Sequence, residues 1–139
     1  MDTIVSDEDV RKASRQLFLD EHYAQAIFEA FKIVNLLVKK LSGIPEKDGK
    51  DLMFSAFNVQ TGSLRISPGS STSERDEQEG FMHIYAGAMQ GIRNPKAHDE
   101  VTQIEAVRTL QYLALASLLV TRAKAAHRTA KPPGDIDHC

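Results

Sequence analysis

The stretch Ile27–Leu41, IFEAFKIVNLLVKKL, decides the fold class. Large apolar residues recur along it at spacings of 4, 3, 4 and 3, namely Ile27, Phe31, Val34, Val38 and Leu41. This spacing puts them on one face and predicts an amphipathic α-helix with a coiled-coil-like seam. Gly43 suits the position just after a helix, and Pro45 cannot continue one. We therefore expect the helix to run from His22 to Ser42.

Two shorter helices are predicted on either side of it. Ser6, followed three residues later by Asp9, resembles an N-cap with its capping-box partner. A first helix over Asp7–Leu19 follows from this pattern. After the central helix, Asp48–Phe57 is expected to form a short helix that points its apolar residues inward.

A third main helix is predicted over Glu74–Ile92, with Ser73 and Asp76 repeating the capping pattern. Its expected apolar face consists of Phe81, Ile84, Tyr85, Ala88 and Ile92. Three glycines also lie in this helix, and each costs about 1 kcal/mol relative to alanine. We expect them to permit the close approach of a neighbouring helix; they are Gly80, Gly87 and Gly91.

The segment Thr61–Gly80 is rich in glycine and serine and is expected to be a long loop. A short extended piece at Leu64–Ile66 is predicted within it. Loops of this length inside a compact domain are usually mobile or functional, so this one is a candidate gate for a cleft.

A long last helix is predicted over Glu100–Arg128, with Asp99 as its N-cap. It is apolar around much of its circumference, with Ile104, Val107, Leu110, Ala114 and Leu118 in one stripe and Leu113, Leu115, Leu119 and Val120 beside it. A helix of this kind is buried on more than one side. In a chain this short, the pattern indicates dimerisation.

Together these elements predict an all-α bundle of four to five helices. Residues 1–129 are expected to form a single domain, and residues 130–139 a disordered tail. The 139-residue chain is 42% hydrophobic and 26% charged, values typical of a soluble globular protein. The net charge of −2 excludes a protein that coats nucleic acid through overall positive charge. Basic residues after Glu105 fit either a favourable helix C-terminus or a surface that follows phosphates.

The single cysteine, Cys139, excludes an internal disulfide and favours a reducing, cytoplasmic location. Met1–Val10 lacks the features of a signal peptide, and Leu110–Val120 is too short to span a bilayer, so no membrane association is expected. The histidines show no ligand spacing, and we predict neither a metal site nor a cofactor.

The candidate chemistry lies in Arg93–His98, RNPKAH. A residue before proline disfavours the α region, so Asn94 is expected to end or kink the incoming helix. Arg93 and His98 would be about 140° apart on an unbroken helix. A break at Pro95 can bring both side chains to one mouth. A guanidinium, an imidazole and the N-terminus of the next helix would together suit a phosphate.

This segment is similar to the R-x4-6-H signature of HEPN domains. Three blocks, Tyr23–Lys32, Asp76–Met82 and Gly91–Asp99, also resemble the Ymh family, a group of uncharacterised prokaryotic proteins within the HEPN grouping. The resemblance covers Tyr23–Thr121. It implies an HEPN-like helical bundle that forms a homodimer, with two Arg/His pairs facing a shared cleft.

The resemblance also implies a metal-independent endoribonuclease, since many HEPN proteins cleave RNA in toxin–antitoxin, abortive-infection or antiviral systems. His98 would match the catalytic histidine, Arg93 the catalytic arginine and Asn94 the polar residue that follows it. Cleavage would leave a 2′,3′-cyclic phosphate. An antitoxin or another regulatory protein would be an expected partner, beside the RNA substrate.

Three further residues are candidates for contact with the substrate or the motif. Lys96 could touch the RNA backbone or be an ordinary exposed lysine. Glu29 could orient Arg93 or Asn94, or be a solvated helix position. Gln78 is a candidate contact as well, although a capping role comes first for it.

Two other functions remain open at the level of sequence. The chain could be a non-catalytic helical module that binds RNA, a nucleotide or a partner protein through the same cleft. It could also be a purely structural dimerisation domain. Cleavage of RNA would separate the first function from both alternatives.

Overall fold

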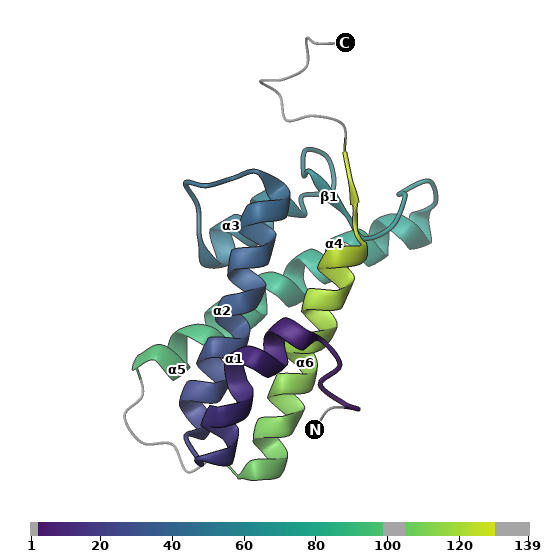
Figure 1. Ribbon diagram of the computed structural model, residues 1–139. Coiled ribbons are helices and arrows are strands. Elements are labelled where there is room, and N and C mark those ends of the chain that lie inside the picture. The colour runs from purple at the N-terminus through teal and green to yellow at the C-terminus, as the bar shows by residue number, and fades with distance from the viewer. Residues whose placement is uncertain (1–2, 99–104, 130–139) are drawn as a thin grey trace.

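The computed structural model describes residues 3–98 and 105–129, with side chains for all of these except Ala97 and His98. The predicted all-α class is confirmed, because helices dominate the described chain (Figure 1). In chain order the elements are α1 (Glu8–Leu19), α2 (Tyr23–Ser42), α3 (Gly49–Ala56), β1 (Leu64–Arg65), α4 (Thr72–Ala88), the π-helix η1 (Met89–Arg93), α5 (Asn94–His98), α6 (Ala106–Ala125) and β2 (His127–Arg128).

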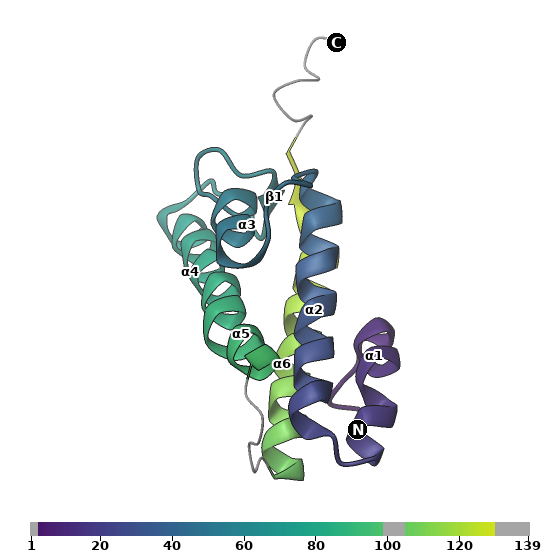
Figure 2. The same ribbon diagram turned by 90° about the vertical axis from the view of Figure 1, so that its left-hand side faces the viewer.

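Helices α2 and α6 form the centre of the molecule, where they pack along each other. Helix α1 covers one side of this pair, while α3, α4, η1 and α5 lie on the other side (Figure 2). Strands β1 and β2 pair antiparallel. None of the helices among the described residues is long and apolar enough to cross a bilayer.

Helix α2 confirms the prediction made from its apolar spacing. It begins one residue after the expected start, and the predicted seam is buried except for the partly buried Leu41. Gly43 follows the last turn with a φ of 72°, in the left-handed region that glycine adopts without strain. The amide of Gly43 donates to the carbonyl of Lys39 and closes the helix at the predicted residue.

The N-terminal helix begins one residue after the predicted start, and its cap is Asp7 and not Ser6. The Asp7 carboxylate accepts a hydrogen bond from the amide of Val10 at 3.0 Å. It also accepts one from Lys124 at 2.8 Å, and its own amide donates to Ser117 Oγ at 2.9 Å. One residue therefore caps α1 and fastens it to α6. Sequence spacing could not reveal this, because the partners lie more than 100 residues away.

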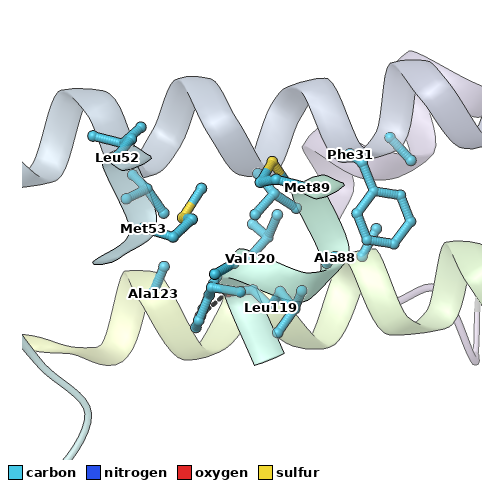
Figure 3. Packing of buried hydrophobic residues seen from close by; sticks show 14 of the residues in the cluster. Phe31, Leu52, Met53, Ala88, Met89, Leu119, Val120 and Ala123 are labelled. Atoms are coloured by element: carbon cyan, nitrogen blue, oxygen red, sulfur yellow. Dashed lines mark hydrogen bonds between the residues drawn. The ribbon is translucent and has the colours of Figure 1, made fainter. Parts of the chain in front are cut away.

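The middle of the core is a crossing of three helical segments. Ala88 and Met89, at the junction of α4 and η1, are buried where this segment crosses the pair formed by α2 and α6 (Figure 3). Phe31 of α2 and Val120 of α6 lie beside them and are fully buried. The Tyr85 hydroxyl donates to the backbone carbonyl of Leu119, which ties α4 to α6.

The predicted break at Pro95 is wrong. Asn94 has helical dihedral angles, φ −63° and ψ −46°, and α5 continues the helix through Pro95. The irregularity is the preceding π turn, in which the Asn94 amide reaches back five residues to the Met89 carbonyl. A proline ring ordinarily clashes with the carbonyl four residues earlier. A widened π turn changes the position of that carbonyl, so the helical path can pass the proline.

Two further predictions for the α4–η1 segment are wrong. No described atom lies within 4 Å of a Cβ built on Gly80, Gly87 or Gly91, so these glycines admit no neighbouring helix of the described chain. Ile84, placed on the apolar face, is exposed, whereas Met82 is buried. The helix crosses its neighbours obliquely, and a face inferred from periodicity alone does not give the crossing angle.

The predicted long loop is shorter than expected and is held at several points. Its extended piece exists as β1, but α4 already begins at Thr72, and its cap is Ser71 and not Ser73. The Ser71 hydroxyl accepts from the Glu74 amide, while Glu74 accepts from Ser70. The loop before α4 therefore packs onto that helix.

A buried amide fixes this loop from beneath. Gln78 of α4 is 1% exposed. Its Oε1 accepts from the Ile66 amide at 2.8 Å, and its Nε2 donates to the carbonyls of Phe57 and Leu64, both at 2.9 Å. Three backbone groups of an irregular segment thus find partners without water.

The last helix is shorter at both ends than predicted. Glu105 has an extended backbone, φ −72° and ψ 158°, so α6 starts at Ala106, and it ends at Ala125. His127 and Arg128 leave the helix and pair with β1. Burial on more than one side is confirmed for part of the helix, since α6 contacts both α1 and α2 and accepts the Tyr85 hydrogen bond, but Val107 and Leu118 of the predicted stripe are exposed. The expected cap Asp99, the stripe residue Ile104 and the tail 130–139 lie outside the described residues.

We expect Gln78→Leu to lower the free energy of unfolding by about 2–3 kcal/mol, because it leaves one amide and two carbonyls without their buried partner. Urea denaturation followed by circular dichroism measures this loss. Glu79→Leu is the matched control, since Glu79 is exposed on the same helix, and we expect a change within about 0.5 kcal/mol. Equal stability of both variants would contradict the role given to Gln78.

Candidate functional site

Arg93 is the last residue of η1, and buried Met89 at the other end of that turn fixes its backbone. Its side chain is half-buried. Nε and Nη2 both donate to Oδ1 of Asn94, at 3.3 and 3.1 Å. Among the described side chains, no carboxylate forms an ion pair with Arg93. The guanidinium is therefore oriented by its neighbour while its charge is not cancelled by a direct contact.

The first residue of α3 lies against this guanidinium. A Cβ built on Gly49 would lie 3.3 Å from Nη2 of Arg93. Gly49 is buried and has a φ of 62°, which side chains rarely tolerate. The backbone angle therefore favours glycine at this position, and a Cβ there would displace the guanidinium slightly.

Helix α2 holds the α3 start in place through a buried amide. Oδ1 of Asn35 accepts from the Gly49 amide at 2.9 Å, and Nδ2 donates to Oδ1 of Asp48 at 2.9 Å. Lys39, one turn along α2, reaches the same Asp48 oxygen at 2.7 Å. Asn35 is 4% exposed and uses both ends of its amide.

The charge of Asp48 is favoured by its neighbours. The hydrogen bond from Lys39 lowers the pKa of the Asp48 carboxyl below its ordinary value, and the hydrogen bond from Asn35 acts in the same direction. The positive charge of Arg93 lowers this pKa further, so the two groups attract each other without an ion-pair contact. The charged form of Asp48 is therefore favoured, near a cation with which it makes no ion-pair contact.

The other member of the predicted pair, His98, is the last residue of α5, and its side chain lies outside the described residues. The helical backbone between the two residues excludes the break that was expected to join them. The pairing of Arg93 with His98 therefore stays a prediction.

Lys96 connects α5 to the last helix. Its Nζ lies 5.5 Å from the centroid of the Tyr112 ring, over the face of the aromatic group. Such a contact is favourable and holds the stem of the lysine along α6. Contact of Lys96 with RNA stays a prediction.

The two other candidates lie apart from the motif. Glu29 is half-buried on α2, and no hydrogen bond or ion pair between described atoms joins it to Arg93 or Asn94. Gln78 has both ends of its amide occupied by backbone groups of the loop. The structure gives Gln78 a structural use and brings neither residue to the guanidinium.

The basic residues near the end of α6 are largely paired. Arg122 contacts Glu77 at 3.3 Å and lies over the Phe81 ring. Lys124 bridges Asp7 and Asp9 at 2.8 and 3.1 Å. Of the two interpretations of this region, the geometry favours helix-end contacts that tie elements together.

Asn35, Asp48 and Gly49 were not predicted as site residues from the sequence. One signal could have drawn attention to Asn35, since it is a polar residue next to the apolar seam of α2, with Lys39 one turn later. Asp48 and Gly49 were assigned only to a helix start. Their nearness to Arg93 depends on tertiary packing and leaves no trace in the spacing.

No group of three or more His, Cys, Asp or Glu side chains that could hold a metal ion occurs within residues 3–98 and 105–129.

In comparisons with known proteins, a family model described as a protein of unknown function (Hypoth_ymh) matches residues 5–123. No curated protein and no solved structure matches the chain.

We expect Arg93→Ala to change the free energy of unfolding by no more than about 0.5 kcal/mol, because the adjacent Asn94 is the only described residue to which its guanidinium is hydrogen-bonded. Arg122→Ala, which removes an ion pair and a ring contact, should cost about 1 kcal/mol. Urea titrations of both variants provide the comparison. A larger loss for Arg93→Ala than for Arg122→Ala would show that Arg93 serves stability.

Proposed function

This chain belongs to the Hypoth_ymh family of proteins of unknown function, and from this membership and the geometry around Arg93 we propose that it is an HEPN-type endoribonuclease. The family match over residues 5–123 includes the whole RNPKAH segment. The observation that carries the proposal is the state of Arg93. Its guanidinium is oriented by Asn94 and packed against Gly49, yet it has no ion-pair partner among the described side chains.

The proposed reaction needs no metal. A base removes the proton of a ribose 2′-OH, the oxygen attacks the adjacent phosphorus, and the 5′-oxygen of the next nucleotide leaves with a proton. The products are a 2′,3′-cyclic phosphate and a 5′-hydroxyl. His98 is the proposed group that takes and returns protons, since imidazole titrates near neutral pH.

Arg93 is the proposed group that stabilises charge on the phosphorus. A guanidinium presents a planar fork that matches two phosphate oxygens. A donor that is already oriented needs little reorganisation when negative charge develops. Asn94 then holds the fork, and Lys96 is a proposed contact with the RNA backbone. A toxin or antiviral effector, restrained by an antitoxin or a regulatory protein, is the role that this chemistry would serve.

A homodimer with two Arg/His pairs at a shared cleft is part of the proposal. One feature that supports association is an exposed apolar face on α6. Val107 is 66% exposed and Leu118 is 48% exposed. The two residues are eleven apart and so share one face of a helix.

The non-catalytic alternative also has an observation in its favour. The helix continues through Pro95, so a break in the backbone does not bring Arg93 and His98 together. A binding module would need only the oriented guanidinium. Cleavage of RNA distinguishes the two functions.

We expect purified protein in EDTA to cut a pool of single-stranded RNAs and to leave the same sequences intact as DNA, which lacks the 2′-OH. Arg93→Ala and His98→Ala should each abolish the fragments that end in a cyclic phosphate. Arg75→Ala and His83→Ala are matched controls, because both side chains are exposed on α4, and they should cut normally. RNA that stays intact with the unaltered protein, or cutting by His98→Ala at an equal rate, would refute the proposed enzyme.

The dimer gives a separate expectation. Light scattering after gel filtration should report twice the chain mass of 15.4 kDa. Val107→Glu/Leu118→Glu should yield monomers, because it places two charges on the exposed face of α6, whereas Leu19→Glu, at a comparably exposed apolar residue of α1, should leave the mass unchanged. A monomeric mass for the unaltered protein would remove the shared cleft from the proposal.

A further inference from the structure

We propose that Asp48 and Gly49, fastened to α2 by Asn35 and Lys39, form a seat that positions Arg93 for phosphate. The seat consists of these four residues. In it, Asp48 is a positioning residue that acts through Arg93 and does not touch RNA. The inference rests on the proposed function for its purpose, although the seat itself is a structural feature.

The guanidinium of Arg93 lies against the backbone at the start of α3. Because Gly49 has no side chain, Nη2 of Arg93 lies only 3.3 Å from the place of a Cβ. The guanidinium therefore packs directly on the first residue of α3. Asn94 accepts from Nε and from this same Nη2, so two neighbouring residues orient the group.

The seat is held in place by bonds to the central helix α2. Asn35 is buried on the central helix and bonds both the Gly49 amide and the Asp48 carboxylate at 2.9 Å. Lys39 adds a bond of 2.7 Å to the same carboxylate oxygen. Hydrogen bonds to a charged group are roughly twice as strong as neutral ones. The start of α3 is thus tied to a helix that belongs to the core.

The side chain of Asp48 does not cap the helix that it precedes. An aspartate that precedes a helix ordinarily accepts from the first amides of that helix. Asp48 makes no such side-chain cap, and its carboxylate is turned to α2 instead. Because the side chain is 60% exposed, water screens its charge from Arg93, and Asp48 acts by fixing the backbone that leads into Gly49.

The arrangement leaves one edge of Arg93 for a ligand. Nη1 makes no hydrogen bond with any described residue, whereas Nε and Nη2 are committed to Asn94. A guanidinium that is fixed on one edge holds its other edge ready for the negative charge that develops on a phosphate in the transition state. Loss of the seat should therefore reduce the rate of the chemical step more than it reduces substrate affinity.

The first experiment compares kcat and KM for RNA cleavage by the full chain. Asp48→Ala should lower kcat about 10- to 100-fold with little change in KM, because a small misplacement of a catalytic group has effects of this size. Asp48→Asn should restore most of the rate, since its amide oxygen can still accept from Asn35 and Lys39. Asp51→Ala is the matched control, an exposed aspartate one turn further along α3, and should leave both constants unchanged.

The second experiment does not depend on cleavage. Phenylglyoxal modifies accessible guanidinium groups, and mass spectrometry of peptides gives the rate at Arg93, with the exposed Arg75 as internal standard. Asp48→Ala and Gly49→Ala should both raise the relative rate at Arg93 severalfold, because the guanidinium leaves its seat. Circular dichroism checks that each variant folds. Asp48→Ala removes a mostly exposed side chain, so it keeps the test decisive if Gly49→Ala does not fold.

The outcomes separate this inference from the proposed function. Faster modification of Arg93 in a protein that cuts no RNA would support the seat and refute the nuclease. Active protein in which Asp48→Ala alters neither kcat nor the modification rate of Arg93 would overturn the seat and leave the nuclease standing. A rise in KM alone would also overturn it, because Asp48 would then act on substrate binding.

Discussion

The packing of the buried residues Ala88 and Met89 against the pair formed by α2 and α6 is the constraint on which the rest of the structure depends. It sets the angle at which α4 crosses the central pair and brings the Tyr85 hydroxyl to the α6 backbone. The buried Met89 also begins the π turn that ends at Arg93, so the packing of the core determines where the guanidinium lies. The buried residue Met89 and the candidate site residue Arg93 thus lie at the two ends of one helical turn.

Two buried side-chain amides form hydrogen bonds with backbone groups of the segments that connect the helices. Gln78 binds the irregular loop around β1, and Asn35 binds the start of α3. In both cases a side chain on a long helix supplies partners to backbone groups that regular structure leaves unpaired. Buried polar groups of this kind are costly unless every atom is satisfied, and no buried side-chain nitrogen or oxygen within the described residues lacks a partner. Such satisfied amides fix one arrangement of the connecting segments.

The distribution of charge separates structural from functional cations. Lys124 and Arg122 pair with carboxylates of other elements, so they tie α6 to α1 and α4. Arg93 differs, because no carboxylate in the described part of the chain forms an ion pair with it, and its neighbour Asp48 is engaged by Lys39. An oriented cation without a direct counter-ion is suited to an anionic ligand, and this physical difference underlies the proposed function more than the count of basic residues does.

The sequence by itself determined the all-α class, the bounds of α2 and the presence of α3, because apolar periodicity and helix-stop residues act within a few neighbouring residues. It also singled out the RNPKAH segment. Only the tertiary structure decided which cap α1 uses, that Ile84 faces solvent, that the helix passes through Pro95 and that Gln78 is part of the core. It alone brought Asn35, Asp48 and Gly49 to Arg93, which lies more than forty residues further along the chain. Local pattern fixes what each segment becomes, whereas crossing angles and long-range contacts depend on how all of the side chains fill one core.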